Sequence, residues 1–289
     1  MPIGSHAWPS GCGGTTWLTR RTSLSLFDLP FQKDFSMRRR IVNGCLYPIA
    51  FMLFLLAVAI AFVAFQGRRT PGGNPEYVAL GSSFAAGAGL GPLQQGSPML
   101  CARSTAGYPQ RLARTLEMSI VDMSCGGAVT ANLLRGGQFF QGAQIRVIDK
   151  ETRLVTITVG GNDVNFVGDL SMLALRKADG LGGWLARRLW SGPRVEEARG
   201  YERLAQELAE TIRAIRTRAP KAAIVVATYP AILPPQGTCP QLRLSEEEAD
   251  LMRPVERRLA AVTRAAALRN GAILVDMNAL GAGHNACSA

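Results

Sequence analysis

Histidine is scarce in this sequence, with only His6 and His284 among 289 residues. None of the six cysteines belongs to a C-x-x-C pair, and His284 is the one imidazole near a cysteine. A structural zinc ion needs four cysteine or histidine ligands at close spacing, so this pattern argues against such a site. No other motif implies a cofactor.

Acidic residues are also few: 21 against 32 lysines and arginines, a net charge of +11. The excess of positive charge is shared between two parts of the chain: residues 1–73 carry a net charge of +6 and residues 74–289 carry +5. In the second part, arginines such as Arg213 and Arg216 stand beside glutamates such as Glu207 and Glu210. This mixture is typical of a solvated helix face and argues against a nucleic-acid partner.

Charge is missing altogether from Leu46 to Phe65, a run of 20 residues. At about 1.5 Å per residue, a helix of this length crosses a bilayer core of about 30 Å. Three arginines precede the run at 38–40 and two follow at 68–69. This bias favours a cytoplasmic N-terminus and an exported C-terminal part, periplasmic or extracellular.

No clean small-x-small cleavage site follows the apolar run, so an uncleaved anchor is favoured over a removed signal peptide. Cleavage would instead give a secreted protein. The predicted organisation is a disordered cytoplasmic tail at 1–40, with Met37 as an alternative start, then a transmembrane signal-anchor at 41–66, a linker at 67–75 and a domain at 76–289.

Apolar, strand-like runs alternate with helical stretches in the domain. Predicted strands cover 76–81, 119–123, 153–159, 222–228 and 272–276, and predicted helices cover 107–117, 196–218 and 245–269. The last helix opens with a capping box, Ser245 with Glu248 three residues on. This alternation predicts an α/β fold with a parallel sheet covered by helices on both faces.

Small or polar residues follow three of these strands, and they are Ser83, Gly127 and Asn162. The carboxyl ends of parallel strands share one edge of a sheet, where open α/β folds bind their ligands. A hydroxyl, a glycine N–H and a side-chain amide are what acyl transfer needs: a nucleophile and donors to an oxyanion.

The three blocks resemble those of SGNH hydrolases, the GDSL lipase/esterase superfamily, and of its secreted, disulfide-containing esterases in particular. The matching stretches are Gly81-Ser82-Ser83-Phe84, the glycine at 127, and Gly160-Gly161-Asn162-Asp163. The resemblance implies a three-layer α/β/α sandwich that hydrolyses carboxylic esters, whether lipid, glycan or small ester. It makes Ser83 the nucleophile, with the oxyanion held by the backbone N–H groups of Ser83 and Gly127 and the side chain of Asn162.

Four cysteines, at 101, 125, 239 and 287, lie in the exported part. An even number in an oxidising compartment favours disulfides, and four cysteines allow three pairings. The resemblance implies Cys101–Cys125 and Cys239–Cys287.

The sequence departs from the family at two places. Ser82 stands where the family has aspartate, which alters the loop but keeps the nucleophile. His284 resembles a histidine that relatives carry upstream of the catalytic one, and we interpret it as a loop histidine near a disulfide. We therefore expect the domain to be truncated before its base. The alternative function is an inactive domain that at most binds an acyl or glycan ligand.

Residues 164–194 separate the third strand from the next long helix and contain Trp184 and Trp190. We predict a cap or a substrate-side insertion here. Helix packing is favoured over an acyl pocket as the role of the tryptophans.

Overall fold

The computed structural model describes residues 33–69 and 71–288. Its centre is a parallel sheet in the order β2-β1-β3-β4-β5. The strands are β1 (Tyr77–Gly81), β2 (Ile120–Asp122), β3 (Leu154–Thr158), β4 (Ala223–Ala227) and β5 (Ile273–Val275). Each lies inside a range predicted from the sequence, so the predicted parallel sheet is confirmed.

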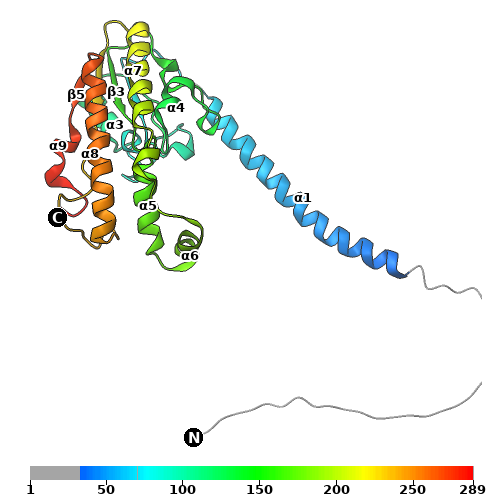
Figure 1. Cartoon of the computed structure of the whole chain (residues 1–289). Coiled ribbons are helices and arrows are strands. Elements are labelled where there is room, and N and C mark those ends of the chain that lie inside the picture. Colours follow the sequence, from blue (N-terminus) through cyan, green and yellow to red (C-terminus); the bar gives the residue numbers. More distant parts are fainter. Residues whose placement is uncertain (1–32, 70, 289) are drawn as a thin grey trace, which may run out of the picture. The chain divides into compact units, whose positions relative to one another are not determined.

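Helices connect the strands and cover the sheet (Figure 1). The domain's α-helices are α2 (Ser83–Ala86), α3 (Tyr108–Thr115), α4 (Thr130–Arg135), α5 (Phe166–Arg176), α6 (Gly180–Leu189), α7 (Tyr201–Arg218), α8 (Glu246–Arg269) and α9 (Met277–Leu280). The 3-10 turns are η1 (Met99–Cys101), η2 (Gln138–Phe140), η3 (Gln144–Val147), η4 (Glu196–Ala198) and η5 (Ala282–His284). The capping box predicted at Ser245 is present at the start of α8.

The two faces of the sheet have separate cores. One core lies between the sheet and a helix layer that includes α4 and α7. It contains the strand residues Val78, Val155 and Ile224, together with Leu208 of α7, which is fully buried. Tyr77 and neighbouring strand residues face α3 on the other side. Burying one such large apolar side chain stabilises the fold by about 1.5–3 kcal/mol. The result is the three-layer α/β/α arrangement that the sequence predicted.

The α3 face is less completely covered over β4 and β5. Alternate residues of β4 are buried, but Val225 and Ala227 are only partly buried, as is Val275 of β5. They line an apolar cavity of about 320 Å³ that also reaches Phe84, the residue after Ser83. This cavity approaches the predicted nucleophile from the sheet side.

Helix α1 (Lys33–Arg68) contains one stretch, Tyr47–Arg68 of 22 residues, that is long and apolar enough to cross a membrane. The helix begins at Lys33, and its apolar stretch overlaps the signal-anchor predicted at 41–66, which stays a prediction. Residues 33–40 contain neither glycine nor proline, and nothing in them stops the helix. Residues 1–32 of the predicted tail, His6 included, lie outside the described residues.

Candidate active site

The loops that follow β1, β2 and β3 meet at the carboxyl edge of the sheet. The backbone N–H of Ser82 donates to the Thr158 carbonyl (2.9 Å) at the end of β3. On the other side, the N–H of Cys125 donates to the Gly81 carbonyl (3.0 Å). These bonds bring the segments that carry Ser83, Gly127 and Asn162 together, as the strand order requires.

Ser83 opens the short helix α2 and is partly buried. Gly81, at the end of β1, has φ 140°, and a Cβ there would lie 2.2 Å from the Thr158 carbonyl oxygen. Only glycine fits that turn, which places the serine directly beyond the strand. Among the described residues, no group forms a hydrogen bond with the Ser83 hydroxyl.

Asn162 is joined directly to the Gly127 loop. Its Nδ2 donates a hydrogen bond to the carbonyl oxygen of Ala128 (2.9 Å), the residue after Gly127. An amide nitrogen carries two hydrogens, so this contact fixes the side chain and leaves one N–H for another acceptor. Gly127 itself has φ 79°, which is favourable for glycine and strained for other residues.

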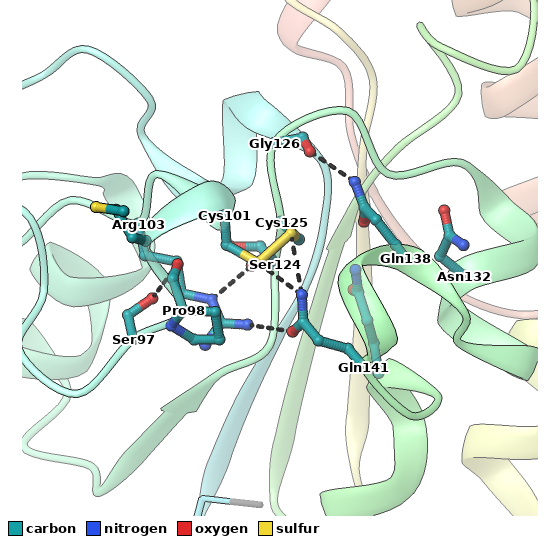
Figure 2. Close-up of a disulfide and its surroundings, with 12 residues drawn as sticks. Ser97, Pro98, Cys101, Arg103, Ser124, Cys125, Gly126, Asn132, Gln138 and Gln141 are labelled. Atoms are coloured by element: carbon teal, nitrogen blue, oxygen red, sulfur yellow. Dashed lines mark hydrogen bonds between the residues drawn. A yellow bond between two sulfur atoms is a disulfide. The ribbon is translucent and has the colours of Figure 1, made fainter. Parts of the chain in front are cut away.

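A disulfide stands directly before the Gly127 loop (Figure 2). Cys101 and Cys125 are bonded, and the carbonyl of Cys101 accepts from the Gly126 N–H (2.9 Å). From the opposite side, Gln138 Nε2 donates to the Gly126 carbonyl (2.7 Å). Gln141 Nε2 donates to Cys101 Sγ (2.9 Å). The loop is therefore fixed on both sides by side chains and by a covalent link.

The strand before this loop ends on a buried polar group. Asp122 accepts from the N–H (3.0 Å) and the hydroxyl (2.5 Å) of Ser124, and Arg103 Nε donates to the Ser124 carbonyl (2.6 Å). Burial raises the pKa of the Asp122 carboxyl, although the Arg103 charge and the Ser124 hydrogen bonds oppose the rise. These contacts fix the path from β2 to the disulfide.

Sequence reasoning missed Tyr229, which belongs to the same edge. Its phenol forms a hydrogen bond with the buried hydroxyl of Ser82, and its ring packs edge-on against Phe84 with centroids 4.8 Å apart. Gly161 lies so close that a Cβ there would be 2.5 Å from the tyrosine ring. Burial raises the pKa of Tyr229 to about 12, so the phenol is neutral at pH 7. The available signal was its position directly after the strand predicted at 222–228.

Asp163, the last residue of the third block, binds the start of α4. Its Oδ1 accepts from the Thr130 N–H (2.9 Å) and hydroxyl, and the same hydroxyl contacts Glu207 (2.5 Å). Burial raises the pKa of Asp163, and the Glu207 charge acts in the same direction. Both carboxyls line a polar cavity of about 740 Å³ beside Asn162.

The remaining candidates lie outside this cluster of contacts. His284 is exposed on η5, close to the second disulfide, Cys239–Cys287. Asp276, another acidic residue at a strand end, follows β5, caps α9 and is paired with Arg264 (2.9 Å). Both disulfides join the cysteines that the resemblance implied. In the described part of the chain, no cluster of three or more His, Cys, Asp or Glu side chains could hold a metal ion.

Residues 79–289, from β1 through all three loops, match the GDSL-like lipase/acylhydrolase family. The chain belongs to this family. Lipase 2 of Streptomyces coelicolor is 30% identical over 260 residues, covering 87% of this chain and 85% of the relative. The lipase of Streptomyces rimosus is 30% identical over 256 residues, covering 88% and 86%.

Solved structures agree with the GDSL-like assignment. An extracellular lipase from Streptomyces rimosus has a TM-score of 0.59 and 32% identity, covering 73% of this chain and 84% of that one. A phospholipase A1 from Streptomyces albidoflavus has a TM-score of 0.58 and 28% identity, covering 73% and 83%. This GDSL-like protein thus shares its fold and family with ester-hydrolysing lipases.

Proposed function

We propose that this protein hydrolyses carboxylic esters through an acyl-enzyme on Ser83. The serine oxygen bonds to the ester carbonyl carbon, and the alcohol leaves with a proton. Water then attacks the acyl-serine, releasing the carboxylic acid and restoring the hydroxyl. Two backbone N–H groups, of Ser83 and Gly127, and the Asn162 amide stabilise the oxyanion in both steps.

The hydrogen bond from Asn162 to the Ala128 carbonyl is the observation that carries this proposal. It holds a side-chain donor against the loop that supplies the Gly127 N–H, and β1 places Ser83 at the same edge. Donors arranged before the reaction stabilise the charge that develops in the transition state without the cost of reorganisation. Family membership supports ester hydrolysis as the reaction.

We propose further that α1 anchors the chain in a membrane and that the hydrolase domain lies on the periplasmic or extracellular side. Two disulfides support this placement, because they persist in oxidising compartments. The substrate class stays a carboxylic ester of a lipid, a glycan or a small alcohol.

The decisive experiment reacts the full chain with a fluorophosphonate probe and with a p-nitrophenyl ester. Probe labelling and hydrolysis should both disappear in Ser83→Ala. The matched control is Ser171→Ala, which removes an exposed serine of α5 and should change neither. Labelling that persists in Ser83→Ala would show that another residue is the nucleophile.

One observation favours a second candidate, a domain that binds an ester-like ligand without turnover. A serine hydroxyl needs a base at neutral pH, and no described residue forms a hydrogen bond with the Ser83 hydroxyl. A wild-type chain that neither reacts with the probe nor turns over ester, yet binds a non-hydrolysable ester analogue, would establish this alternative.

A further inference from the structure

Helix α6 exposes four large apolar side chains along one face, which is interrupted by the exposed Arg188. Leu181, Trp184, Leu185 and Leu189 are 72, 54, 37 and 76% exposed. Their spacing of three, four and eight residues places them on one side of the helix. Ala186, on the other side, is buried. The prediction that the tryptophans serve helix packing therefore holds for Trp190, which packs against a buried core cluster. It does not hold for Trp184, which is exposed to solvent.

The hairpin of α5 and α6 extends from the domain away from the sheet (Figure 1). In Figure 1, α6 lies beyond the end of α5, at the part of the domain farthest from the strand labels. An apolar groove of about 380 Å³ runs between the two helices, and its walls include Met172, Leu175, Leu185 and Trp190. Exposed apolar surface of this extent, rimmed by charge, marks an interaction site.

The charge around this face is almost all positive. Residues 171–195 contain five basic side chains and one acidic side chain, Asp179, and one of the five, Lys177, is ion-paired with Glu248 (2.6 Å). Arg187 and Arg188 of α6 form no ion pair with any carboxylate of the described residues. Arg187 Nη1 donates to the backbone carbonyls of Arg176 (2.5 Å) and Ala178 (3.2 Å), whereas the Arg188 side chain has no hydrogen bond to a described residue. Arg176 lies over the Trp190 ring, 5.7 Å from its centroid. A second copy of the same face would bring like charges together, which opposes self-association.

We propose that the apolar face of α6, with its arginines, docks on the anionic surface of a lipid bilayer. Leucine and tryptophan side chains enter the headgroup–acyl boundary, where the amphipathic tryptophan ring is favoured. The long arginine side chains keep their guanidinium groups at the phosphates. The groove between α5 and α6 receives part of an acyl chain. Docking of this face is independent of the reaction at Ser83.

The test places one full-length chain in each nanodisc and measures quenching of Trp184 by brominated acyl chains. Subtracting the signal of Trp184→Phe isolates this tryptophan. We expect strong quenching in brominated phosphatidylglycerol and weaker quenching in brominated phosphatidylcholine. Replacing Arg187 and Arg188 by glutamine should lower the docked-to-undocked ratio in phosphatidylglycerol by about fivefold for each arginine removed.

Two matched pairs of variants separate docking from general hydrophobicity. Leu181→Ser with Leu189→Ser should abolish quenching of Trp184. Leu251→Ser with Leu268→Ser, which removes two exposed leucines of α8, should leave it unchanged. Equal signals in brominated and unbrominated discs would overturn the proposal. A change in Trp184 emission that occurs only in discs with two copies of the chain would also overturn the proposal, because it would identify the face as a protein–protein interface. The glutamine variants keep their apolar face and test the charge requirement even if the serine pair is unstable.

Discussion

Ser82 and Tyr229 are joined by a hydrogen bond between their side-chain hydroxyls, although 147 positions separate them in the sequence. Both residues are fully or almost fully buried. The bond links the residue before Ser83 to the loop that follows β4, and the tyrosine ring also covers Gly161. One side chain thus spans the first and third blocks of the site.

Removing either partner of this bond should destabilise the domain. Ser82→Ala and Tyr229→Phe each leave a buried hydroxyl without a partner, which costs about 1–3 kcal/mol. The double variant removes both hydroxyls and should cost less than the sum of the two. Urea denaturation of the four proteins gives the coupling directly. Strict additivity would show that the two hydroxyls do not interact in solution.

Asn162→Ala should lower kcat by about 10²–10³ and change KM little, because the amide stabilises charge that appears only in the transition state. Asn162→Asp keeps the size but places an acceptor opposite the Ala128 carbonyl, so we expect a loss at least as large. Steady-state kinetics on a soluble ester separates kcat from KM. A change confined to KM would make Asn162 a residue that positions substrate.

The strands and the strand-end residues could be predicted because they depend on local pattern. Buried apolar runs such as Leu154–Thr158 have a length and composition that specify a central strand, and parallel connection then brings Ser83, Gly127 and Asn162 to one edge. The chemistry proposed for the site depended in addition on the resemblance of the three blocks to those of SGNH hydrolases.

The parts that were missed depend on packing between distant segments. Tyr229 becomes important through contacts with Ser82 and Gly161, and nothing in its own neighbourhood shows them. The break between α5 and α6 lies at 177–179, just before Gly180 with φ 84°, and the sequence analysis set no helix boundaries within 164–194. Periodicity also gave no signal that α1 begins as early as Lys33, because residues 33–40 contain five charged side chains and only two large apolar ones.

Opening the Cys101–Cys125 link in Cys101→Ser/Cys125→Ser should reduce both stability and kcat. The chain-entropy model assigns about 3 kcal/mol to a link of this separation, and the Gly126 N–H loses a fixed partner. The matched control, Cys239→Ser/Cys287→Ser, opens a link of 48-residue separation and should lose similar stability. Its kcat should stay close to that of the wild type, because it does not adjoin the Gly127 loop. Peptide mapping without reductant must first recover both links, and a Cys125–Cys239 link would contradict the pairing.

Asp276 should make stability depend on pH on the acid side. Partial burial alone would raise the pKa of Asp276. Hydrogen bonds from Arg264, the Ala279 N–H and Thr228 lower it, and so does the Arg264 charge. Together they outweigh the burial, so the pKa lies below its ordinary value. A carboxyl with a lowered pKa in the folded state stabilises above its unfolded pKa of about 3.9. The stabilisation is lost as pH falls through the folded pKa.

Asp276→Asn should therefore cost about 1 kcal/mol at pH 7, a value typical of a partly exposed ion pair, and almost nothing near pH 2. Guanidinium unfolding across this range measures the difference. Glu210→Gln, an exposed carboxyl on α7, is the control and should show no such trend. A cost for Asp276→Asn that is constant with pH would show that the hydrogen bonds matter and the charge does not.

The last prediction concerns His284, the one histidine among the described residues. Its side chain is exposed on η5 and forms no hydrogen bond with any described residue, whereas a catalytic base must reach the serine hydroxyl. We therefore expect the His284→Ala variant to react with ester or fluorophosphonate at a rate within about twofold of the wild-type rate. This expectation holds whether the wild-type rate is high or low. Removing the base of a comparable triad costs on the order of 10⁶ in kcat, so the two outcomes are well separated. The measurement compares wild type, His284→Ala and Ser83→Ala at pH 7 and 9. A fall in His284→Ala to the level of Ser83→Ala would identify His284 as the base, and would show that η5 moves to the serine during the reaction.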